Sequence, residues 1–202
     1  MTTSSANTRS PQQERSRLTR ERLLRSTVDA LAADGWAAAT VAAVAERAGV
    51  SRGAAQHHFP TREDLITAAL EHVFENLTMR ATDEAERLPP GAGRIEVAVA
   101  TAVEFYTGQE FKAALQVWCA AASDESLRRL ILPLEGRFGA AAHSMTVHML
   151  GVDDSDPKVH RLVQATLDFA RGLGLADTLS DDSARRRQVV GAWAEQLRVS
   201  LR

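Results

Sequence analysis

The chain has 202 residues, 45% of them hydrophobic and 25% charged, a composition typical of a soluble globular protein with one or two domains. No apolar run approaches the roughly 18 residues needed to span a bilayer, and residues 1–17 are too polar for a secretory signal, so neither a membrane protein nor a secreted one is expected. The single cysteine, Cys119, cannot form an internal disulfide, which favours a reducing, cytoplasmic location.

The net charge of −2 is unevenly divided along the chain. Residues 1–62 carry nine arginines against five acidic residues, a net charge of +4. The remainder carries 15 basic and 21 acidic residues, a net charge of −6. This division is expected of a DNA-binding head on a body that does not adhere to nucleic acid.

The first expected helix covers residues 19–34. Thr19 can cap its N-terminus, and Gly35 can end it because glycine readily adopts the left-handed conformation that follows many helices. Four apolar residues recur at helical spacing and are expected to face a core: Leu23, Leu24, Val28 and Leu31.

Residues 40–59, TVAAVAERAGVSRGAAQHHF, predict two short helices joined by a tight turn at 48–50. Thr40 can cap the first helix and Ser51 the second, while Gly49 allows the sharp turn between them. This is the helix-turn-helix layout, whose second helix lies in the major groove of DNA. Small residues there let the backbone approach DNA, and Arg or Gln side chains can bind base edges or phosphate. The predicted DNA contacts are Thr40, Ser51, Arg52, Gly53, Ala54, Gln56, His57, Arg62 and Arg17.

From about Thr19 to Leu70 the chain resembles the DNA-binding domain of the TetR/AcrR family of transcriptional regulators. The likeness rests on AADGW at the end of the first helix, then TVAAVAERAGVSRGA and HHFPTREDL. Ala55 departs from the pattern because a large aliphatic residue usually fills the domain core there. Gln56 stands where a tyrosine usually touches the DNA backbone, although its amide can still donate a hydrogen bond.

The resemblance implies an all-α fold of about nine helices. We expect a flexible N-terminal arm over 1–15 and a three-helix helix-turn-helix domain over 16–61. A helical effector-binding and dimerisation domain is expected over 62–202. The helices predicted for this domain cover 62–88, 94–107, 110–122, 124–150, 158–178 and 182–200, with Pro133 expected to kink or split the fourth. Good helix starts occur at Thr61 with Asp64 in a capping box, at Ser123, at Asp156 and at 180–182.

Bulky and polarisable side chains of the middle helices are candidates for an effector pocket, which the resemblance places among these helices. The candidates are Phe105, Trp118, Cys119, Phe138, His143, Met145 and Phe169. The alternative is that they simply form the core, since such residues at helical spacing usually do. A mainly apolar pocket with a few polar groups suits a small lipophilic effector.

The last two helices are the expected surface of a homodimer. Their candidate interface residues are Leu162, Thr166, Phe169, Leu173, Val190, Trp193 and Leu197. In the family the two C-terminal helices pair with those of a partner chain, and a palindromic operator requires a two-fold dimer. The alternative is that both apolar stripes cover the core of their own chain.

The favoured function is therefore a dimeric repressor, released from a palindromic double-stranded DNA operator by a small lipophilic ligand. A ligand-independent repressor or architectural protein is the alternative. A helical enzyme using Cys119 and His143 is a weaker one, because neither residue is marked as activated. His143 and His148 are five residues apart and off one helix face, and HExxH and CxxC motifs are absent, so no metal or cofactor is expected.

Overall fold

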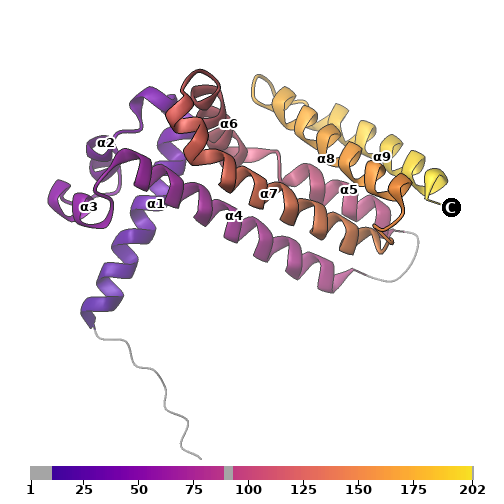
Figure 1. Ribbon diagram of the computed structural model, residues 1–202, viewed down its shortest axis with the longest axis horizontal. Helices are drawn as coiled ribbons and strands as arrows, with labels where there is room; N and C mark the ends of the chain where they lie inside the picture. The colour runs from indigo at the N-terminus through magenta and orange to yellow at the C-terminus, as the bar shows by residue number, and fades with distance from the viewer. Residues whose placement is uncertain (1–10, 89–92, 202) are drawn as a thin grey trace, which may run out of the picture.

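The computed structural model describes residues 11–88 and 93–201, which form nine α-helices and no strand (Figure 1). The all-α prediction is confirmed. The helices are α1 (Pro11–Ala38), α2 (Val41–Arg47), α3 (Arg52–His58), α4 (Arg62–Arg87), α5 (Arg94–Glu104), α6 (Gly108–Ser123), α7 (Glu125–Leu150), α8 (Pro157–Asp177) and α9 (Ser183–Ser200). We call α1–α3 the head and α4–α9 the body.

Helix α1 begins at Pro11, so the prediction of a start at Thr19 is wrong. Ion pairs from Arg17 to Glu14 and Glu21 stabilise the additional turns, since side chains three or four residues apart are neighbours on a helix. This first part of α1 projects from the rest of the molecule (Figure 1). Of the predicted N-terminal arm, residues 11–15 are helical, and residues 1–10 lie outside the described part.

The predicted helix ends and starts are mostly confirmed. Gly35 interrupts α1 with φ 80°, as its position after the apolar stripe predicts. Thr61 and Asp64 form the capping box at the start of α4. Helix α7 is capped by Asp124 instead of Ser123 and continues through Pro133, so the split predicted there is wrong. The helix predicted over 62–88 ends at Arg87, and the Pro-Pro-Gly segment 89–91 that predicts this end lies outside the described residues.

One hydrophobic core extends from the head into the body, because α1 packs against both α4 and α6. Within the body α7 contacts α4, α5 and α6, while α5 lies beneath α8 and α9. Helices α8 and α9 run side by side at the opposite end of the molecule from α2 and α3 (Figure 1). In the described ranges no helix is long and apolar enough to cross a membrane.

Candidate nucleic-acid interface and ligand cavity

The turn between α2 and α3 is built by local hydrogen bonds and one glycine. The Ala43 amide donates to Thr40 Oγ1 at 3.2 Å, and the Ala54 amide donates to Ser51 Oγ at 3.2 Å, so both predicted caps are confirmed. Gly49 adopts φ 63°, the left-handed conformation that a side chain would disfavour. The angle between α2 and α3 is therefore set locally, by the cap at Ser51 and the turn at Gly49.

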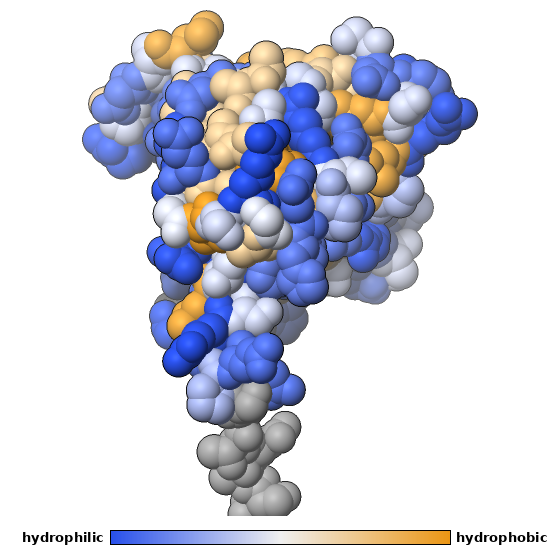
Figure 2. Space-filling view, turned by 90° about the vertical axis from the view of Figure 1, so that its left-hand side faces the viewer, coloured by the Kyte–Doolittle hydropathy of each residue, from blue (hydrophilic) through white to orange (hydrophobic). Residues whose placement is uncertain are grey.

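Helix α3 has one exposed face and one buried face. Arg52, Gly53, Gln56 and His57 are exposed, whereas Ala55 is buried in the head. An added Cβ at Gly53 would meet no atom within 4 Å, so another backbone can approach closely there. Within the described chain Arg52 forms no hydrogen bond or ion pair, which leaves its guanidinium available. Hydrophilic residues predominate on this end of the molecule (Figure 2).

The two histidines at the end of α3 have different surroundings. His57 is exposed, while His58 is half-buried beside the ring of Phe59. Burial lowers the pKa of His58 below its ordinary value, and the positive charges of His57 and Arg20 add to the effect. The cationic character of this face at neutral pH therefore depends on Arg52, not on His58.

Two arginines predicted to contact DNA already have partners in the head. The Arg62 guanidinium lies 4.0 Å from the centroid of the Trp36 ring, and its Nε donates to the Ala39 carbonyl at 3.0 Å. Arg17 is exposed on the projecting part of α1, where the hydrogen bond and charge of Glu14, and then of Glu21, raise its pKa. Arg62 thus connects the start of α4 to the residues at the end of α1. A DNA contact by Arg17 or Arg62 stays a prediction.

A small cavity lies between α4, α6 and α7 in the body. It offers about 50 Å³ to the centres of water-sized molecules. Its walls are almost entirely apolar, apart from the carboxylates of Glu110 and Glu135. The lining residues are Leu70, Val73, Phe74, Leu77, Phe105, Glu110, Phe111, Ala114, Trp118, Ile131, Leu134, Glu135 and Phe138. The aromatic rings meet edge to face, with centroids 5.4 Å apart for Phe74 and Phe138 and 5.8 Å apart for Phe111 and Trp118.

A wider groove of about 480 Å³ adjoins the cavity and shares Leu77, Phe105 and Glu110 with it. Its charged lining consists of Asp83, Glu84, Glu104 and Glu110 against Arg80 and Arg87. The approach to the cavity is therefore richer in negative than in positive charge.

Three of the predicted ligand-binding residues line the cavity, namely Phe105, Trp118 and Phe138. The others do not: Cys119 is exposed on α6, and Met145 is half-buried against the core. Phe169 stacks on Trp193 with ring centroids 5.3 Å apart. His143 instead bonds to Asp154. The sequence analysis missed the α4 wall, because its apolar residues could not be distinguished from ordinary core.

The apolar stripes of α8 and α9 face the core of their own chain. Thr166 and Leu197 are fully buried, and Leu173 is 6% exposed. The Trp193 Nε1–H donates to Thr166 Oγ1 at 3.1 Å, which joins the two helices. Leu162 and Val190 are half-buried against a small apolar cluster formed by Val99, Ala194 and Leu197. Thr166, Leu173 and Leu197 are therefore not available to a second chain, and a contact by the half-buried residues stays a prediction.

Two short helices joined by a tight turn, with a polar and cationic outer face on the second, define a helix-turn-helix DNA-binding protein. The family model for bacterial regulatory proteins of the tetR family matches residues 23–69. This match places the helix-turn-helix segment of the chain in that family.

Known proteins are similar in sequence and in fold. The chain is 35% identical over 120 residues to the HTH-type transcriptional regulator CymR of Pseudomonas putida, a match that covers 59% of each chain. A solved structure of a transcriptional regulator from Pseudomonas aeruginosa PAO1 matches with TM-score 0.70 and 21% identity, covering 94% of this chain and 92% of that one. A regulator from Saccharomonospora viridis, solved in complex with choline, matches with TM-score 0.65 and 21% identity over 87% and 95%. These two structures support the fold alone.

Proposed function

We propose that this chain is a transcriptional repressor that binds a palindromic DNA operator as a homodimer and is released by a small lipophilic cation. The observation that carries the proposal is a continuous packed connection between α3 and the cavity. Helix α1 contacts α2 and α3 in the head, and it packs against α4 and α6, two of the three helices that wall the cavity. A ligand that moves these walls therefore acts on the helix that holds the head.

Release requires that the ligand bind the DNA-incompetent arrangement more tightly than the DNA-bound one. The two recognition helices of a dimer must lie about 34 Å apart to enter successive major grooves, so a tilt of each head is sufficient to weaken binding. Coupling of about 1–3 kcal/mol, a change of 5- to 150-fold in affinity, is typical of such switches. DNA must weaken ligand binding by the same factor.

The chemistry of the cavity favours a cation among lipophilic ligands. Glu110 and Glu135 are the charged residues of its described lining, and the other lining residues include five aromatic side chains, a type that can attract cations through its ring face. Glu110 also has Arg80 at 3.5 Å, which leaves Glu135 as the better partner for a ligand. The regulator from Saccharomonospora viridis was solved with choline, a quaternary ammonium ion, which agrees with this choice of ligand class.

A matched pair of probes tests the cavity. Benzyltrimethylammonium should bind and release the protein from its operator, whereas neopentylbenzene, the neutral molecule of the same shape, should bind more weakly. Glu135→Gln should weaken benzyltrimethylammonium about tenfold or more and leave neopentylbenzene unchanged, because it removes a charge and little volume. Calorimetry measures binding, and fluorescence anisotropy of labelled operator measures release.

Ala114→Trp is the control for the location of the ligand, since it fills the cavity from α6. It should abolish probe binding, and its operator affinity without probe, measured first, is the reference for the release experiment. If the cation binds Ala114→Trp as well as the unaltered protein, its site lies elsewhere. If probes bind without changing operator affinity, the ligand-independent repressor is correct, an alternative that the small cavity volume favours.

The outer faces of α8 and α9 are the proposed dimer surface. Both are lined by small or apolar exposed residues that allow close approach of a second pair of helices: Ala165, Gly172, Leu175 and Ala176 on α8, and Gly191, Ala192 and Val199 on α9. We expect a second copy of this chain to bind these faces, because a palindromic operator is bound by a two-fold symmetric dimer.

Gly191→Glu should shift the dimer toward monomer, since it places a charge on the proposed two-fold surface. Glutamate favours helix over glycine, so the fold of each chain should be retained. Gly136→Glu on the exposed face of α7 is the matched control and should leave the dimer intact. Sedimentation velocity measures the assembly. A folded Gly191→Glu protein that remains dimeric would place the interface on other helices.

A further inference from the structure

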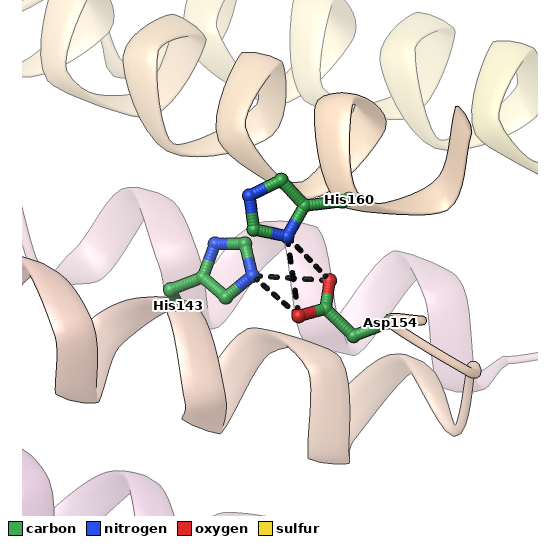
Figure 3. Close-up of side chains that lie close together, drawn as sticks. All are labelled: His143, Asp154 and His160. Carbon is green, nitrogen blue, oxygen red and sulfur yellow. Dashed lines mark hydrogen bonds and ion pairs between the residues drawn. The ribbon is translucent and has the colours of Figure 1, made fainter. Parts of the chain in front are cut away.

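Outside the cavity and α3, the structure brings two histidines and one aspartate together where α7 meets α8 (Figure 3). His143 comes from α7, His160 from the first turns of α8, and Asp154 from the loop between them. His143 Nε2 lies 3.1 Å from both carboxylate oxygens of Asp154, and His160 Nδ1 lies 3.1 and 3.2 Å from them. The two imidazole rings point at one carboxylate from opposite helices (Figure 3).

We propose that His143, Asp154 and His160 bind a divalent transition-metal ion of the zinc class, with one coordination position left open. The ligand atoms of the three residues all lie within 4.8 Å of one another. Ligands that are each about 2.1 Å from a zinc ion lie roughly 3.0–3.4 Å apart at angles near 90–110°. The nitrogen–oxygen distances of 3.1–3.2 Å already match that spacing. A metal replaces the two imidazole protons that would otherwise hold the group together.

The local backbone fixes the loop that supplies the carboxylate. Gly151 ends α7 in the left-handed conformation with φ 67°. The Ser155 amide donates to Asp153 Oδ1 at 3.0 Å, and Asp156 caps α8 by accepting from the Lys158 amide at 2.8 Å. Asp154 is held between these two turns. The backbone of the loop that carries Asp154 is therefore prearranged by short-range hydrogen bonds.

One side of the group faces a surface groove. His143 is largely buried, with 18% of its side chain exposed, whereas Asp154 and His160 are 33% and 42% exposed. The groove of about 620 Å³ that borders both imidazoles also includes Gln164 and Arg171. Three protein ligands with an open side leave a position for water or for an anionic group, as in metal sites that bind an exogenous ligand. Arg171 lies on the same groove, where it pairs with Asp168 at 2.8 Å and can add a hydrogen bond to such an anion.

The donor set selects among metals. Two imidazoles and one carboxylate suit Zn²⁺, Co²⁺ or Ni²⁺, whereas Mg²⁺ and Ca²⁺ prefer oxygen ligands throughout. A bound ion would connect the end of α7 to the start of α8, on the opposite side of α7 from the proposed ligand cavity. None of the three proposed metal ligands lines the ligand cavity, so the two are separate sites.

The test uses the full chain, treated with EDTA and then desalted. Zn²⁺ should bind with one ion per chain by calorimetry, and a hundredfold excess over its dissociation constant should raise the melting temperature by roughly 5–10 °C. Co²⁺ should give visible absorption bands of a nitrogen- and oxygen-ligated site. Mg²⁺ and Ca²⁺ should do neither.

Variants distinguish this site from other histidines. His143→Ala, Asp154→Asn and His160→Ala should each weaken Zn²⁺ binding at least tenfold and remove the Co²⁺ bands. His148→Ala, also on α7 but exposed, should bind as the unaltered chain does. Asp154→Asn keeps the shape of the side chain and removes its charge, so it still tests the site if the His143 variant does not fold. Absence of stoichiometric binding in the unaltered protein, or full binding by Asp154→Asn and His160→Ala, would overturn the proposal.

Discussion

Gly174→Ala is expected to lower the free energy of unfolding by about 3 kcal/mol or more, the largest effect of an added methyl group at any glycine of the described residues. A Cβ at Gly174 would fall on the carbonyl oxygen of Tyr106, where α8 crosses the segment after α5. Tyr106 is fully buried, and its ring meets those of Phe111 and Phe138 edge to face. The backbone of such a residue cannot move without disturbing its neighbours, so α8 must move instead.

Two other glycines provide controls for this substitution. Gly172 in α8 and Gly136 in α7 have nothing within 4 Å of an added Cβ. Gly172→Ala and Gly136→Ala should therefore be neutral or stabilise by up to about 1 kcal/mol, since alanine favours the helix. Urea denaturation followed by circular dichroism gives all three values. A Gly174→Ala protein within about 1 kcal/mol of the unaltered chain would contradict the close approach of α8 to Tyr106.

Features determined by neighbouring residues could be predicted from the sequence. The caps at Thr40, Ser51 and Thr61 and the turn at Gly49 each depend on atoms within a few positions, and all four are confirmed. The early start of α1 was missed because residues 11–18 include only one large apolar residue, Leu18, and so show no apolar stripe at helical spacing. Ion pairs along its surface stabilise it instead.

Features that depend on distant contacts could not be predicted. Apolar periodicity identified one face of α8 and one of α9, but it could not tell whether the covering surface belonged to the same chain. The contact between Trp193 and Thr166 answers that question for the buried faces. Likewise helical spacing relates His143, as a metal ligand, only to residues of its own helix such as His148. Its partners are Asp154, 11 residues away in a loop, and His160 on the next helix.

Arg52→Ala is expected to weaken operator binding by at least about 30-fold. Each lost contact of an arginine with a base or phosphate costs about 1–3 kcal/mol, and the proposed dimer loses two. Arg52 is suited to this contact because it is exposed at the start of α3 and has no partner within the described residues. The operator can be obtained by selection from random DNA, and anisotropy gives the affinity. Arg128→Ala, an exposed arginine of α7 paired only with Glu125, should have no effect.

The same variant distinguishes reading of a base from binding of phosphate. If Arg52 contacts a base edge, the alanine protein should lose its preference at one base pair in each half-site and keep the others. If Arg52 contacts phosphate, affinity should fall equally on all sequences, and the slope of log affinity against log salt should decrease by about two for the dimer. Gln56→Ala is a comparison for base reading. The Gln56 amide can bind adenine but carries no charge, so its loss should leave the salt dependence unchanged. An Arg52→Ala protein with unchanged affinity and unchanged sequence preference would show that another surface binds DNA, because the cationic side chain of α3 would then take no part.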